Sequence, residues 1–123
     1  MVYNSNNIAV KLEQNTLCKK YNAEYLEAAP GTIVGIAKDF SMAKMPINGL
    51  RHPREKNASG WYIWSGDKYS SEQDYFEPMH LSHVVEKYPV LLPYLGLAPG
   101  WRFLIDPNNS YEDVWFDKQL LDI

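Results

Sequence analysis

Cysteine and long apolar runs are scarce in this sequence, and each scarcity excludes a class of protein. The 123 residues include one cysteine, Cys18, so the chain can form no internal disulfide, which is typical of a reducing compartment. No stretch approaches the roughly 20 apolar residues that a membrane-spanning helix needs. Residues 1–7 have neither the basic start nor the apolar centre of a secretion signal. We therefore expect a cytoplasmic protein without a membrane partner.

Positive charge is also scarce, and its distribution is uneven. The net charge is −3, which argues against a nucleic-acid partner held through its phosphates. Residues 1–60 carry a net charge of +3, whereas residues 61–123, with ten acidic and four basic residues, carry −6. Such an acidic half either keeps a protein soluble or attracts a basic partner.

The sequence lacks the motifs of common enzymes. It has no phosphate-binding glycine loop, and neither its cysteine nor its serines lie in the setting of a known nucleophile. The densest acidic pair, Glu112 and Asp113, would point to opposite faces of a strand, which is a poor arrangement for acid–base catalysis. We therefore expect no catalytic residues and a protein that is not an enzyme.

Two histidines and one turn leave a second hypothesis open. His80 and His83 are three positions apart at the start of an expected helix, so they could share a face and bind zinc with a nearby carboxylate. The His-Glu-x-x-His pattern is missing, so our first expectation is no metal and no cofactor. The alternative is a small-ligand- or metal-binding domain, or a small enzyme, that uses the turn from Trp64 to Asp67 together with these histidines.

A dense run of aromatic residues marks the centre of the expected sheet. Residues 59–67 read Ser-Gly-Trp-Tyr-Ile-Trp-Ser-Gly-Asp, a short aromatic and β-branched run between glycines, which predicts a strand at 60–65 buried on both faces. Trp61 and Ile63 would point to one side, and Tyr62 and Trp64 to the other. Similar runs predict further strands at 32–37, 101–105 and 112–116, with 106–110 as a hairpin connection. The alternation at 8–12 predicts another short strand, with a helix as the alternative.

Helical spacing appears mainly in two places. Apolar residues recur every three or four positions over 15–29 and again over 80–88, which predicts amphipathic helices there. Residues 90–97 suggest a short helical turn or an apolar loop, and residues 117–123 suggest one helical turn. Asn48-Gly49 suggests a turn, residues 51–57 suggest a polar loop, and residues 69–78 suggest an acidic and aromatic loop. The prediction is a single α+β domain over 1–123, in which a mainly antiparallel sheet of four or five strands packs against one longer helix and one or two short helices.

Some of the aromatic residues must lie outside the core, because four tryptophans and nine tyrosines are too many for a domain of this size. Those surrounded by acidic residues have the composition of a protein interface, although exposed aromatic residues without a function would look the same. The predicted partner-binding residues are Tyr69, Asp74, Tyr75, Glu77, Tyr111, Glu112 and Asp113.

Four short segments carry a resemblance to a known family. They are Ser59-Gly60-Trp61, Ser65-Gly66-Asp67, Pro93-Tyr94-Leu95 and Gly100-Trp101-Arg102-Phe103. In this order they are similar to bacterial immunity protein family 33, over about residues 32–123. Lys68 stands where the family usually has an acidic residue. Residues 1–30 would then be an N-terminal strand and helix extension to an immunity-like core at 32–123.

The resemblance implies a function without catalysis. Members of the family are expected to be cytosolic proteins that bind and neutralise a cognate toxin in a polymorphic toxin system between bacteria. No catalytic residues come with the family. The acidic second half of this chain would suit a basic toxin through complementary charge.

Overall fold

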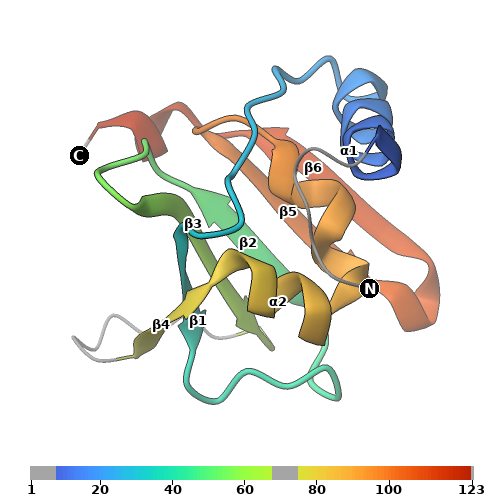
Figure 1. The fold of residues 1–123 in the computed structure, drawn as a ribbon. Helices are drawn as coiled ribbons and strands as arrows, with labels where there is room; N and C mark the ends of the chain where they lie inside the picture. The colour runs from blue at the N-terminus through green and yellow to red at the C-terminus, as the bar shows by residue number, and fades with distance from the viewer. Residues whose placement is uncertain (1–7, 68–74, 123) are drawn as a thin grey trace.

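A six-stranded sheet organises the fold in the computed structural model, which describes residues 8–67 and 75–122. The strand order is β4-β1-β3-β2-β5-β6, and every neighbouring pair is antiparallel except β1 and β3 (Figure 1). The predicted single-domain α+β fold is confirmed, although the sheet has six strands where we expected four or five. The strands are β1 (Ile33–Ala37), β2 (Ile47–Arg51), β3 (Ala58–Ser65), β4 (Phe76–His80), β5 (Trp101–Asp106) and β6 (Tyr111–Phe116).

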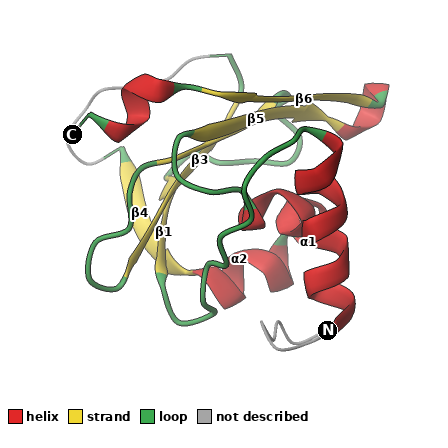
Figure 2. Cartoon of the chain, turned by 90° about the horizontal axis from the view of Figure 1, so that it is seen from above, coloured by secondary structure: helices red, strands yellow, loops and turns green. Residues whose placement is uncertain are grey.

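The two faces of the sheet are covered unequally. Helices α1 (Ile8–Lys20) and α2 (Leu81–Lys87) and the 3₁₀ helix η1 (Pro89–Gly96) lie on one face, and the main hydrophobic core forms between them and the sheet (Figure 2). The opposite face carries the short 3₁₀ helix η3 (Lys118–Leu121), whose Leu120 packs on Leu50 and Trp64. A third 3₁₀ turn, η2 (Pro107–Asn109), lies in the β5–β6 hairpin. No helix within the described ranges is long and apolar enough to cross a membrane.

Strand β3 lies in the middle of the sheet with apolar groups on both faces, as the sequence predicted. Trp61 and Ile63 belong to the main core under the helices, whereas Trp64 packs on the opposite face. Tyr62 departs from the expectation of full burial, because 37% of its surface is exposed. The uncovered part of the opposite face therefore presents an aromatic ring to solvent.

The predicted strand at 8–12 is wrong, because these residues begin helix α1. Val10, Gln14, Leu17 and Cys18 are buried along one side of α1, and the amide of Gln14 donates to the carbonyl of Leu92 in η1 at 3.0 Å. A buried polar residue within the apolar stripe concealed the helical period from the sequence reading.

The predicted helix at 15–29 is too long, because α1 ends at Lys20. Asn22 has a left-handed backbone with φ of 54°, which ends the helix, and the chain then runs extended so that Tyr25 forms a bridge with Leu97. Later in the chain, the predicted strands at 32–37, 60–65, 101–105 and 112–116 correspond to β1, β3, β5 and β6.

Two segments expected as a turn and a loop are strands. Asn48 and Gly49 lie in the middle of β2, because the ring of Phe103 packs directly over the position where a Cβ of residue 49 would stand. Glycine there permits a close approach and makes no turn. Phe76–His80, expected as the end of a loop and the start of a helix, forms β4 along β1, and α2 begins at Leu81.

Arg51, expected in a polar loop, is fully buried at the end of β2. Its guanidinium donates to the carbonyls of Leu26 and Leu97 at 2.7 Å each, and its Nε donates to the carbonyl of Ser59 at 3.0 Å. The same group lies 5.7 Å from the ring centroid of Trp61. One side chain thus joins β2, β3, the extended segment after α1 and the segment after η1.

Gly60, the glycine of β3, should be sensitive to substitution. Its φ is +94°, and a Cβ would collide with the backbone carbonyl of His52. We expect Gly60→Ala to lower the free energy of unfolding by about 3 kcal/mol or more, since strain and overlap add. Urea titration measures this, with Gly31→Ala as control because no atom lies within 4 Å of its Cβ. Similar losses in both variants would contradict the prediction.

Candidate partner-binding surface

The first motif block, at the start of β3, makes its contacts inside the fold. The hydroxyl of Ser59 donates to the carbonyl of Ile33 at 2.8 Å and accepts the amide of Trp61 at 3.1 Å. The indole of Trp61 donates to the carbonyl of Leu95 at 3.1 Å. These bonds fix β3 against β1 and against η1, so this block builds the scaffold.

The later motif residues act in the same way, with one exception. The hydroxyl of Ser65 accepts the amide of Ser41 at 2.9 Å, and the amides of Gly66 and Gly100 donate to the carbonyls of Pro46 and Arg51. Trp101 is half-buried, with its ring centroid 5.6 Å from that of Phe116. Asp67 differs because its side chain is exposed beside a hollow of about 200 Å³ that Asp39 and Lys44 also line.

The residues of the ligand-binding hypothesis do not come together. His80 pairs with Ile33 at the first residue of β1, whereas Asp67 follows the other end of β3, which runs parallel to β1. The rings of His80 and His83 are 5.6 Å apart, but the hollow at Asp67 contains neither of them nor Trp64. Outside residues 1–7, 68–74 and 123, no three His, Cys, Asp or Glu residues are grouped so that they could hold a metal ion.

The predicted partner-binding residues divide between the two edges of the sheet. Tyr75 and Glu77 lie at the β4 edge, and Tyr111, Glu112 and Asp113 lie in β6 at the opposite edge (Figure 1). Tyr69 and Asp74, also predicted, fall outside the described residues. The structure thus offers two separate acidic and aromatic surfaces where the sequence had suggested one.

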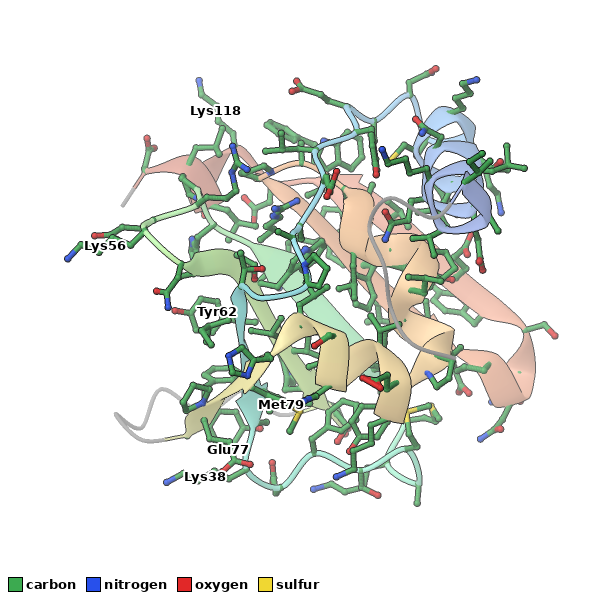
Figure 3. The ribbon with its side chains drawn as sticks, viewed as in Figure 1. Lys38, Lys56, Tyr62, Glu77, Met79 and Lys118 are labelled. Atoms are coloured by element: carbon green, nitrogen blue, oxygen red, sulfur yellow. The ribbon has the colours of Figure 1, made fainter. Side chains whose placement is uncertain are left out.

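The surface near β4 is an aromatic cluster on the uncovered face. The ring of Phe76 lies edge-to-face with Tyr62 and Tyr75, at centroid distances of 5.2 and 4.9 Å. A hollow of about 220 Å³ lies beside Tyr62, Phe76 and Glu77. Figure 3 shows Glu77 and Lys38 at the same end of the β1–β4 pair. The exposure of Tyr62 was missed because the sequence pattern of β3 is apolar on both faces.

The surface at β6 is built around Glu112. Its carboxylate accepts the hydroxyls of Tyr21 and Tyr94, each at 2.5 Å, and the ammonium group of Lys20 at 2.8 Å. Lys20 and Tyr21 come from the end of α1, and Tyr94 comes from η1. Glu112 therefore joins β6 to two elements that cover the sheet. These partners lie 18 to 92 positions away in the sequence, so no local pattern could reveal them.

The hydrogen bonds at Glu112 affect the pKa values of the groups involved. Burial alone would raise the pKa of Glu112, but the three donors outweigh this effect and lower it. Burial, followed by the bond to Glu112, raises the pKa of both Tyr21 and Tyr94. Glu112 is thus held as a carboxylate, and both tyrosines remain protonated donors at neutral pH.

Three other side chains of β6 are open to solvent, whereas Val114 is buried in the main core. Asp113 is exposed and, within the described part of the chain, forms no ion pair. Tyr111 and Phe116, at the two ends of the strand, are 52% and 48% exposed. A hollow of about 310 Å³ lies beside Glu112, between Val90, Tyr94 and Tyr111. Exposed aromatic residues of this kind are enriched in protein interfaces.

A comparison with protein families gives a match over most of the chain. The model of the Imm33-like domain matches residues 13–117. This range begins within α1, earlier than the motifs suggested, and ends just after β6. No curated protein and no solved structure matches the chain.

Glu112→Gln should test the role of the carboxylate in stability. We expect the variant to lose about 1–2 kcal/mol of unfolding free energy at pH 7, because a neutral amide accepts these bonds more weakly. Since the folded pKa of Glu112 is lowered from its ordinary value of 4.5, its contribution is present above that pH and is lost as pH falls below it.

The difference between the wild type and Glu112→Gln should therefore narrow in urea titrations at progressively more acidic pH. Asp113→Asn is the matched control, because it makes the same chemical change at the exposed neighbour. A constant difference between wild type and Glu112→Gln across pH would show that the charge of Glu112 is not what stabilises the fold.

Proposed function

The chain belongs to the Imm33-like family, and from this premise we propose that it is a bacterial immunity protein that binds and neutralises a cognate toxin. The family match over residues 13–117 is the observation that carries the proposal. Neutralisation would be stoichiometric, because the chain would cover the toxin without catalysing a reaction. The place of action would be the cytoplasm, where the toxin meets its target.

The proposed toxin is basic where it touches this chain. Residues 61–123, which carry a net charge of −6, supply both acidic surfaces, at β4 and at β6. Opposite charges on the partner would accelerate association and fix the orientation of the complex. The predicted contact residues Tyr75, Glu77, Tyr111, Glu112 and Asp113 remain candidates, together with Tyr69 and Asp74.

Co-expression with the toxin domain encoded by the neighbouring gene tests this function. We expect the two chains to elute together from a sizing column as a one-to-one complex, and we expect the complex to lack the activity of the free toxin. Gly60→Ala, which disturbs the scaffold, should lower the yield of complex. Separate elution with full toxin activity would contradict the proposal.

The affinity of this complex should depend on salt. Raising NaCl from about 50 to about 500 mM should increase the dissociation constant at least about tenfold, because salt screens charges across the interface. Titration calorimetry at several salt concentrations measures the effect. An affinity that does not change with salt would contradict a charge-matched basic partner, while leaving toxin binding itself intact.

A further inference from the structure

Strand β6 forms one edge of the sheet, and its free side can be derived from the backbone. The amide of Asp117 donates to the carbonyl of Gly100 in the direction of β5. Because peptide groups alternate along an antiparallel strand, Asp113 and Trp115 also direct theirs toward β5. Glu112, Val114 and Phe116 then direct their N–H and C=O groups away from the sheet. In the strand order of the sheet, no described strand follows β6.

The charged side chains of β6 are all acidic, so they oppose pairing with an acidic strand but not with a basic one. Edge strands commonly carry proline or lysine, and β6 (Tyr-Glu-Asp-Val-Trp-Phe) has neither. The other edge strand, β4, contains Pro78, which has no N–H to donate. Tyr111 and Phe116 add exposed apolar surface at both ends of β6. The β6 edge is therefore the better template for an added strand.

The side chains of β6 specify the charge of such a strand. Glu112 pairs with the buried Ile105, so it faces the helix-covered side, and Asp113 faces the opposite side. A residue paired with Glu112 on an added strand would lie over the hollow of about 310 Å³. A carboxylate has about four acceptor positions, and Glu112 accepts three donors, so one more cationic donor fits.

We propose that the toxin is bound by strand addition at the β6 edge, through an extended toxin segment with a lysine or arginine opposite Glu112 and a second basic residue near Asp113. This inference rests on the proposed toxin-binding function. Backbone hydrogen bonds from Glu112, Val114 and Phe116 would supply affinity, and the two carboxylates would select a basic segment.

A second copy of the chain is a poorer occupant of this edge. Pairing of β6 with itself would bring Glu112 and Asp113 of both copies to one seam, where four carboxylates repel one another. A basic segment neutralises the same groups. The exposed ammonium group of Lys20, with 64% of its side-chain surface accessible, can move aside for such a segment.

Residue-resolved amide hydrogen exchange tests the proposal on the ¹⁵N-labelled chain, free and bound to the toxin domain encoded by the neighbouring gene. The amides of Glu112, Val114 and Phe116 should exchange at least about tenfold more slowly in the complex, whereas those of Asp113 and Trp115, already bonded to β5, should change less. An added strand produces this alternation because it bonds to every second amide of β6. A complex without it would overturn strand addition and leave toxin binding intact, and the absence of any complex would overturn both.

A charge substitution locates the contact independently. Asp113→Lys should raise the dissociation constant at least about tenfold, because a like charge then faces the basic segment. Glu86→Lys makes the same charge change at an exposed position of α2 and should stay within about twofold of wild type. Equal effects of the two variants would show that only the overall charge matters, and would overturn the placement at β6. Urea titration of both variants checks that each remains folded.

Discussion

The buried guanidinium of Arg51 is the interaction on which the rest of the structure depends. A charged group removed from water is costly unless it is hydrogen-bonded, and here the backbone carbonyls of Leu26, Ser59 and Leu97 accept hydrogen bonds from its Nε and Nη1. Because carbonyls carry no titratable group, these bonds do not change with pH. They also require the segment after α1 and the segment after η1 to lie in one place relative to β2 and β3. Loss of any one carbonyl position would leave part of a buried charge unbonded.

The motif segments and the candidate binding surfaces use largely different residues, although Tyr94 belongs to both. The side chains of Ser59, Trp61 and Ser65 form hydrogen bonds with backbone groups within the fold, so these residues stabilise the sheet and its connections. The exposed acidic and aromatic groups lie at the edges, outside these motifs. Such a division lets one scaffold keep its core while its edges change from partner to partner. Glu112, which lies outside the motif segments, has both roles, since it joins the end of α1 and η1 to β6 and faces the proposed partner.

Local patterns predicted β1, β3 and the β5–β6 hairpin, because their β-branched and aromatic runs are bounded by turn residues. The same reasoning failed where distant contacts decide the structure. Asn48-Gly49, which has the sequence of a turn, lies within a strand because the ring of Phe103 packs over Gly49. Gln14 lies on the apolar face of α1 because its amide donates to the carbonyl of Leu92. The sequence could not show that Tyr75 and Glu77 lie at one edge of the sheet and Tyr111 and Asp113 at the other. That placement depends on the strand order, which sequence periodicity does not reveal.

The position of Cys18 has a consequence for how the opening of α1 could be followed in time. The only cysteine of the chain is buried on α1 against η1, and burial raises the pKa of its thiol to about 11. While α1 is docked, a reagent therefore cannot reach Cys18, and the thiol is not ionised to the reactive thiolate. The rate at which a thiol reagent labels Cys18 therefore reports the rate at which α1 detaches from the rest of the fold. Comparison of that rate with global unfolding would tell whether α1 detaches alone, as a separate cooperative unit, or only when the whole sheet opens.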